Sequence, residues 1–424
     1  MSSSVKKRSD IPVEHTWDLE KMFANTEAWE QAYKKVQDLI PKVTVFQGKL
    51  GESADTLLAA LQVQDELEAA FENVYVFANM RSHQDLSNTT YQGMVDRATG
   101  LAAQAMGASS FFRPEVIALP KEKIESFLAE NEGLKQYQIL LERLMREKDH
   151  VLSPVEENLI ARMAEVAEAP ATIYSRFANA DLKFPQAEDS KGELHDVTEG
   201  QYRVLMEAED RTLRKNGFKK LFGTYGNYKS TFGATLTSSM KKDAFIASTR
   251  KYDSTLEMAL SPDNMPTEVY DNLIQAVRDN MDTMHRYVSL RKKVLGLDEL
   301  HYYDLFIPMV DEVKQEMPYE KAQGIILDAL TPLGEEYVTT VQRAFDERWI
   351  DIYPNEGKRS GAYSWGTYES LPFILLNYTN TQDDMFTLAH ELGHSLHSYF
   401  TNKTQPVTYG NYTIFVAEVA STLN

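Results

Sequence analysis

The chain has 424 residues, of which 43% are apolar and 25% charged, and this composition excludes a disordered or collagen-like protein. At the usual size of about 150 residues per domain, the length predicts two or three packed units. The 44 Lys and Arg against 63 Asp and Glu give a net charge of −19, the wrong sign for binding a phosphate backbone, so we expect no nucleic-acid partner. The sequence contains no cysteine, which excludes disulfides and thiolate metal sites.

The first ten residues, MSSSVKKRSD, contain no apolar stretch that could form the core of a signal peptide. The charge-free stretches further along fall short of the ~20 apolar residues that a membrane helix needs. We therefore expect a cytoplasmic protein with no membrane partner.

The first two thirds of the chain predict a succession of helices. Apolar residues recur at helical spacing from Trp29 to Ile40, from Leu57 to Phe77 and again over 91–112. The pattern changes over 182–198, where two short extended pieces flank a polar stretch, and this predicts a β-hairpin. We therefore expect an N-terminal helical lobe over 1–170, followed by a region over 171–424 that carries the chemistry.

The segment 351–378 is rich in Gly, Tyr and Ser, which favours short strands and turns. Within it, the apolar run Phe373–Leu376 after Pro372 is typical of a buried strand, although periodicity alone leaves a helical piece open. Thr381 and Asp384 follow with the spacing of a capping box, so a helix is expected to begin near Asp383.

That helix carries His390-Glu391-Leu392-Gly393-His394. Residues four apart share one face of a helix, so both imidazoles can bind one metal ion, with Glu391 beside the open coordination position. This spacing is typical of a zinc peptidase. The alternative is a buried helix with partly exposed histidines and an ordinary surface glutamate.

A catalytic zinc site needs a third protein ligand. His397 follows seven residues after His390 on the same straight helix and would crowd the metal along a line, so we expect it beside the ligands or against the substrate. After Glu391 the only remaining Asp or Glu is Glu418, within an apolar run. Because burying an unpaired carboxylate is unfavourable, a cation beside Glu418 is expected. The alternative is a glutamate on the exposed face of a short amphipathic helix.

These segments resemble the M3 oligopeptidases and, among them, the oligoendopeptidase F group. Similar features run from near Thr16–Leu19 to the last residue. The motifs that carry the resemblance are Thr387–His397, Phe415–Ser421, Lys358–Ser364, Pro372–Tyr378 and His301–Leu305.

The resemblance implies a mainly α fold of two lobes that enclose a deep substrate channel, with a small β-element near the zinc site. It implies a zinc-dependent endopeptidase that hydrolyses internal bonds of short unfolded oligopeptides, because folded proteins would not enter the channel. One zinc ion would be held by His390, His394 and Glu418, with Glu391 as the general base. A His/His/Glu ligand set favours zinc over manganese or cobalt.

The same resemblance implies that Gly361, Ala362 and Tyr363 form an edge strand that pairs with the peptide backbone, and plain turn chemistry is the alternative. The chain ends six residues after Glu418, whereas family members continue, so we expect a truncated catalytic region completed by a further C-terminal segment or chain. No oxyanion-stabilising residue can be assigned from these residues.

Two other functions stay open at this point. One is a catalytically inactive peptide-binding module of the same fold, against which the intact Glu391 argues. The other is a helical scaffold whose histidines bind no metal. Neither the cleavage-site preference nor the oligomeric state follows from the sequence.

Overall fold

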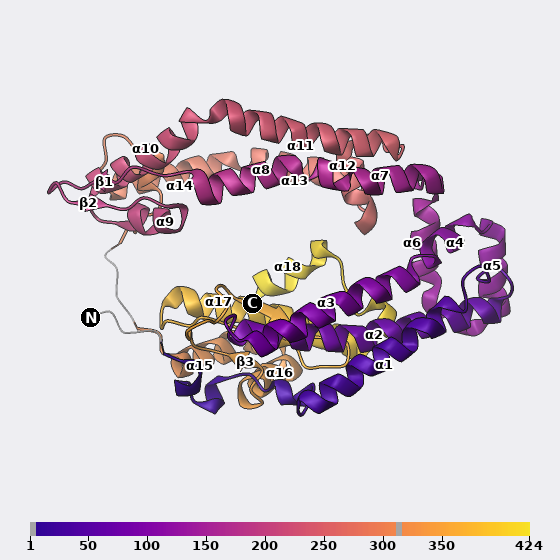
Figure 1. Ribbon diagram of the computed structural model, residues 1–424. Helices are drawn as coiled ribbons and strands as arrows, with labels where there is room; N and C mark the ends of the chain where they lie inside the picture. Colours follow the sequence, from indigo (N-terminus) through magenta and orange to yellow (C-terminus); the bar gives the residue numbers. More distant parts are fainter. Residues whose placement is uncertain (1–5, 311–315) are drawn as a thin grey trace. The chain divides into compact units, whose positions relative to one another are not determined.

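The computed structural model describes residues 6–310 and 316–424 (Figure 1). The chain forms two compact units, the first built from Met1–Lys148 together with Gln315–Asn424 and the second from Asp149–Lys314. The boundary near residue 170 that the sequence predicted falls inside the second unit. The first unit is discontinuous because the N-terminal helices share their core with strands near residue 374. Met1–Val5, which begin the stretch used to exclude a signal peptide, lie outside the described residues.

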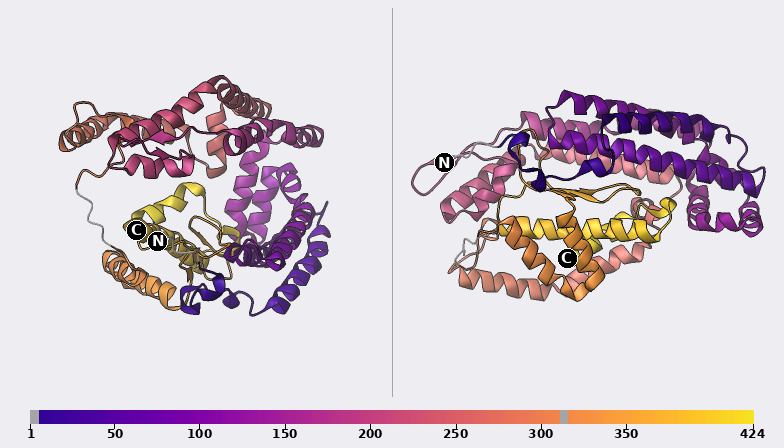
Figure 2. Two further views of the ribbon diagram at one scale, coloured as in Figure 1. Left: turned by 60° about the vertical axis from the view of Figure 1, so that its left-hand side comes forward. Right: turned by 90° about the horizontal axis from the view of Figure 1, so that it is seen from below.

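The first unit is mainly helical. Its long N-terminal helices, α1, α2 and α3, pack against one another along their lengths (Figure 2). The sequence prediction of helices over these three segments is confirmed. The helices in the first segment of this unit, Met1–Lys148, are α1 (Thr26–Thr44), α2 (Ala54–Gln84), α3 (Thr89–Ser109), α4 (Phe112–Ala118), α5 (Lys121–Glu130) and α6 (Gln138–Arg146).

In the second segment of the first unit, Gln315–Asn424, a small three-stranded sheet lies between two helical layers. Its order is β3-β5-β4, with β3 parallel and β4 antiparallel to the central β5. Among the described strands, β4 pairs with β5 alone and so forms an edge. The elements are α15 (Tyr319–Ala329), α16 (Glu335–Asp346), β3 (Ile350–Asp351), β4 (Tyr363–Trp365), β5 (Phe373–Leu375), α17 (Gln382–Thr404) and α18 (Ile414–Leu423).

Strand β5 is buried on both faces because alternate side chains enter different cores. Phe373 and Leu375 pack into the core made with α1, α2 and α3, whereas Ile374 and Leu376 pack into the core made with α15, α16 and α17. The buried strand predicted from this apolar run is confirmed. It holds α17 in a fixed position relative to the N-terminal helices.

A buried ion pair anchors the loop between β3 and β4. The side chains of Lys358 and Asp351 are 0% and 1% exposed, with Lys358 Nζ 2.7 Å from Asp351 Oδ1. Arg8 also donates hydrogen bonds to the Asp351 carboxylate. These two cations hold the pKa of Asp351 below its usual range against the opposing effect of burial.

The second unit contains the predicted hairpin, β1 (Ala187–Glu188) paired antiparallel with β2 (Leu194–His195). Its helices are α7 (Pro154–Ala167), α8 (Ala169–Arg176), α9 (Glu199–Glu207), α10 (Arg211–Asn227), α11 (Lys229–Thr249), α12 (Thr255–Leu260), α13 (Thr267–Asp279) and α14 (Met281–Val294). Asp304, from one of the segments that carry the resemblance, is fully buried and pairs with Arg211 and Arg214 at 2.9 Å each. Its role in this unit is therefore structural.

The mainly α fold with a small β-element is confirmed, while the deep channel stays a prediction. Across the described ranges, no helix combines the length and the apolar character needed to cross a membrane.

Candidate metal centre

Helix α17 starts where the sequence predicted, and its first turn shows why. The Thr381 hydroxyl accepts a hydrogen bond from the Asp384 backbone N–H at 3.1 Å, while Asp384 Oδ2 accepts one from the Thr381 N–H at 2.9 Å. This reciprocal capping box satisfies backbone donors that the helix itself leaves unpaired. The helix then continues to Thr404 and carries both motif histidines on one face.

The two histidines converge with Glu418 of α18. Glu418 Oε2 lies 3.5 Å from His390 Nε2 and 3.6 Å from His394 Nε2. One donor atom from each residue falls within 4.8 Å of the others. Two imidazole nitrogens and a carboxylate oxygen are the donor types that zinc prefers, and three protein ligands leave a position for water.

A glycine in the middle of α17 permits this convergence. A Cβ at Gly393 would stand 2.6 Å from both the Ala420 carbonyl oxygen and the Ser421 Cα. No side chain fits in that gap, so α18 can approach α17 closely enough to bring Glu418 to the histidines only because residue 393 is glycine. This role was not predicted from the sequence, although a glycine inside an otherwise helical pattern can indicate a packing constraint.

Glu391 lies between the two histidines in sequence and is only 7% exposed. Burial raises the pKa of its carboxyl to about 7, against a hydrogen bond from the Ser364 backbone that lowers it. A carboxyl group with a pKa near neutrality can both accept and return a proton at physiological pH.

Glu418 differs from expectation in its burial. Its apolar neighbours suggested a buried carboxylate, but the side chain is 57% exposed. The reason is that the apolar residues of α18 are themselves largely exposed, with Ile414 at 74% and Val419 at 59%. The groups that lie beside the Glu418 carboxylate are the two imidazoles, and the cation expected there stays a prediction.

The expected substrate strand lies two residues further along than predicted. Gly361 has φ +84°, a left-handed conformation that interrupts extended backbone, and the strand β4 begins at Tyr363. Gly361 and Ala362 instead line a cavity of about 260 Å³ beside the start of α17. Of the three predicted residues, Tyr363 alone belongs to the edge strand.

His83, on α2, forms a hydrogen bond with Tyr363. Arg359 Nη1 lies 3.1 Å from His83 Nε2, and because a guanidinium only donates, this nitrogen accepts. The proton of the neutral ring is therefore on Nδ1, which donates to the Tyr363 hydroxyl at 2.7 Å. Burial and the Arg359 charge lower the pKa of His83 to about 4, so the ring stays neutral at pH 7.

His397 does not join the cluster of possible ligands. Its ring stacks on Tyr412 at a centroid distance of 3.7 Å, and its buried Nδ1 has no hydrogen-bond partner among the described residues. Burial lowers the pKa of this imidazole. The expectation that His397 does not complete the metal site agrees with this position.

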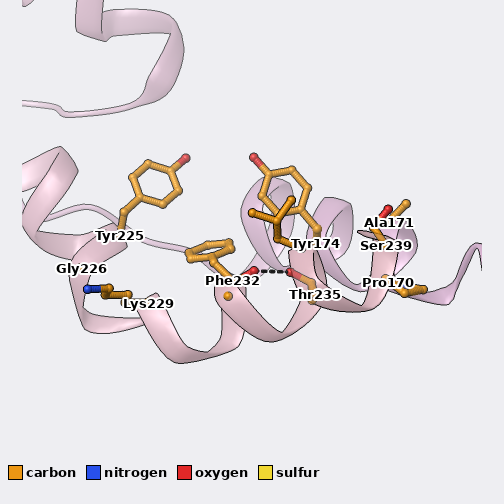
Figure 3. Close-up of a pocket in the computed structure, with 11 residues that line it drawn as sticks. Pro170, Ala171, Tyr174, Tyr225, Gly226, Lys229, Phe232, Thr235 and Ser239 are labelled. Carbon is orange, nitrogen blue, oxygen red and sulfur yellow. Dashed lines mark hydrogen bonds between the residues drawn. The ribbon is translucent and has the colours of Figure 1, made fainter. Parts of the chain in front are cut away.

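The second unit contains a larger cavity than the one beside α17, with a different kind of lining (Figure 3). It measures about 730 Å³ and lies between α8, α10 and α11, where Tyr174, Tyr225 and Phe232 turn their rings toward it. Its described lining contains no carboxylate or imidazole that could bind a metal or activate water.

A second group of potential ligands, Asp189, Glu193 and His195, lies in the β1–β2 hairpin. Asp189 Oδ1 already accepts hydrogen bonds from the backbone N–H groups of Lys191 and Glu193, at 2.8 and 2.9 Å. The hairpin turn therefore explains this carboxylate without a metal.

Comparison with known proteins identifies the family of this chain. The family model described as Peptidase family M3 matches residues 204–424, and one described as Oligopeptidase F matches 115–184. The chain belongs to peptidase family M3. The resemblance seen in the sequence is thereby confirmed.

Curated relatives match this M3 chain almost from end to end. Oligopeptidase PepF of Bacillus subtilis is 44% identical over 423 residues, 100% of this chain and 63% of the relative. Group B oligopeptidase PepB of Streptococcus agalactiae is 40% identical over 417 residues, 98% of this chain and 69% of the relative. The M3 chain thus spans about two thirds of the length of these relatives.

Solved structures share its fold. A protein of Chlamydophila abortus described as a peptidase superposes with a TM-score of 0.90 at 32% identity, covering 99% of this chain and 71% of the other. Oligoendopeptidase-F from Enterococcus faecium gives a TM-score of 0.62 at 31% identity over 94% of this chain and 65% of the other.

Proposed function

We propose that this chain carries the catalytic centre of a zinc-dependent endopeptidase that hydrolyses internal bonds of short unfolded oligopeptides. The observation that carries the proposal is the convergence of His390, His394 and Glu418 around one point, with the Glu391 carboxyl on the same helix. The names of the similar proteins, oligopeptidase and oligoendopeptidase, support the substrate class.

The donor set fits a single zinc ion. His390, His394 and Glu418 would hold it, and nitrogen and oxygen ligands of this kind favour zinc over manganese or cobalt. When bound, the ion supplies a Lewis acid that polarises the scissile carbonyl and lowers the pKa of a coordinated water.

Glu391 would act as the general base. Its carboxylate accepts a proton from the attacking water and returns it to the leaving amine, which cannot depart as an anion at neutral pH. Its burial removes competing bulk water, and the raised pKa makes the carboxylate a stronger base toward the attacking water.

The edge strand β4 would bind the peptide backbone. An extended peptide can add to the unpaired side of β4 through main-chain hydrogen bonds. Gly361, Ala362, Tyr363 and His397 are proposed as substrate-binding residues. The cytoplasmic location and the absence of nucleic-acid partners stay predictions from the sequence.

The test is cleavage of a mixed oligopeptide pool by the 424-residue chain, read by mass spectrometry. We expect internal cleavage that a chelator abolishes. Glu391→Gln should lower turnover by about 10²–10⁴-fold while retaining zinc, because only the base is removed. His390→Ala should lose the metal itself. Unaltered turnover in Glu391→Gln would contradict the mechanism, and tightly bound zinc in His390→Ala would contradict the ligand set.

The same assay distinguishes the alternatives. Zinc and peptide binding without cleavage would indicate an inactive peptide-binding module, and absence of zinc would indicate a scaffold. Where the chain alone cleaves nothing, the assay is repeated with a longer chain that spans the full length of the relatives.

A further inference from the structure

The first unit contains an acidic cavity of about 240 Å³ between α2, the turn that follows β4 and the loop that follows α17. Glu68 and Glu72 of α2 form one wall, and Trp365, Tyr368 and Tyr412 contribute aromatic surface. Among the described residues that line it there is no Lys, Arg or His. The cavity therefore has a negative charge with no cation of its own.

This cavity lies along the same face of α17 as the general base. Glu391, Ser395, Ser398 and Asn402 follow at spacings of four, three and four residues, so their side chains share one helix face. Ser398 and Asn402 line the cavity. At 1.5 Å per residue, Ser398 and Asn402 lie about 10 Å and 16 Å along the helix axis from Glu391.

The edge strand runs beside that face toward the cavity. At one end the Ser364 and Ser395 hydroxyls share a hydrogen bond of 2.8 Å, and further along Asn402 Nδ2 donates to the Thr367 carbonyl at 3.1 Å. A peptide paired with β4 would advance about 3.3 Å per residue. Counted from the bond next to Glu391, the peptide residues three to five positions away therefore lie beside Ser398 and Asn402 in the cavity wall.

The charged forms of Glu68 and Glu72, in the cavity wall, are destabilised by their surroundings. Desolvation raises the pKa of both Glu68 and Glu72, and repulsion from Asp65 on Glu68 and from Glu68 on Glu72 raises each further. Glu72 accepts one hydrogen bond, from the Tyr368 N–H at 3.3 Å. Asp65 is already engaged by the hydroxyls of Tyr137 and Thr408, at 2.8 Å each. A cation in the cavity would relieve this repulsion and could also contact the aromatic faces.

We propose that the cavity of Glu68, Glu72 and Tyr368 is a specificity pocket for a cationic group of the peptide, three to five residues from the scissile bond. The inference rests on the proposed endopeptidase function. The cationic group is either a Lys or Arg side chain or the free N-terminal amine, which share the same chemistry.

The test is a peptide series in which one Lys is moved along an otherwise neutral, N-acetylated sequence, with kcat/KM measured for each member. We expect a maximum when Lys lies three to five residues from the cleaved bond, on one side only. In a parallel series without acetylation, a maximum that depends on the free amine would identify the N-terminus as the occupant. Equal kcat/KM for every member of both series would overturn the proposal.

The matched variants are the double change Glu68→Gln with Glu72→Gln and the control Glu66→Gln. Glu66 lies on the same helix but pairs with Lys35 at the exposed surface. The double variant keeps the size of both side chains and one acceptor oxygen on each while removing their charge. It should lower kcat/KM at least tenfold for the preferred Lys peptide while leaving its Ala counterpart unchanged. The control should change neither.

An equal loss on the Lys and Ala peptides would also overturn the proposal while leaving the endopeptidase function intact. If neither this chain nor the longer chain cleaves any peptide, the proposed function fails, and calorimetric titration with the same uncleaved Lys and Ala peptides tests the pocket separately. Tighter binding of the Lys peptide that disappears in the double variant supports it, and equal affinities contradict it.

Discussion

The Ser421 hydroxyl donates a hydrogen bond of 2.9 Å to Glu418 Oε2, the same oxygen that lies closest to both imidazoles. Because Ser421 is buried, this contact fixes the direction of an otherwise exposed carboxylate. Partners that orient a metal ligand in this way commonly contribute a factor of about 10–100 to metal affinity.

Ser421→Ala should therefore weaken zinc binding about tenfold, measured by competition with a chromophoric chelator. Thr422→Val is the matched control, because the Thr422 hydroxyl bonds to the Glu418 backbone carbonyl and not to its carboxylate. If both variants bind zinc like the original chain, Ser421 does not orient the ligand.

Gly393→Ala should separate α18 from α17. The added methyl group would meet backbone atoms of Ala420 and Ser421, which cannot rotate away as a side chain can. We expect zinc affinity to fall by at least tenfold. Gly100→Ala in α3 is the control, since a Cβ there meets nothing within 4 Å and alanine stabilises a helix interior by up to about 1 kcal/mol. Normal zinc affinity in Gly393→Ala would show that α18 can shift without cost.

Stability should depend on the protonation of His83 between pH 4 and 6.5. The folded pKa of about 4 lies below the ordinary histidine pKa of 6.5, so in this window the unfolded chain binds the additional proton. The free energy of unfolding should consequently rise with pH across the window, by at most about 3 kcal/mol from this residue.

Urea unfolding of the original chain and of His83→Gln at pH 4.5 and pH 7 measures this contribution. Other groups titrate in both chains, so the difference between the two isolates His83. A pH dependence that is the same in both would show that the ring does not stay neutral in the fold.

Asp351→Asn should destabilise the first unit by about 3–5 kcal/mol, because the side chain of Lys358 is fully buried and would lose its charged partner. Adding Lys358→Met should restore part of that loss by removing the unpaired charge. Denaturant midpoints measure both variants. A double variant less stable than Asp351→Asn would indicate that Lys358 contributes through its contacts with the Asp351 and Tyr353 carbonyls.

The features predicted best from the sequence are those that depend only on residues close together along one helix or one hairpin. The spacing of His390 and His394, the capping box of Thr381 and Asp384 and the β1–β2 hairpin are all local, and the structure has each of them. Features that depend on contacts between distant segments were missed or misplaced. The fit of Gly393 against Ala420, the left-handed conformation of Gly361 and the exposure of Glu418 depend on how α17, α18 and the sheet meet.

The first unit is discontinuous, and this affects the order in which a ribosome can complete it. Trp17 packs edge-on against Phe373, and the core of α1, α2 and α3 also includes Leu375. At roughly 5–20 residues per second, the residues between 148 and 375 take on the order of 10–45 s to synthesise. During that interval the N-terminal helices leave the ribosome with part of their apolar surface uncovered, and the second unit is made before the first can close.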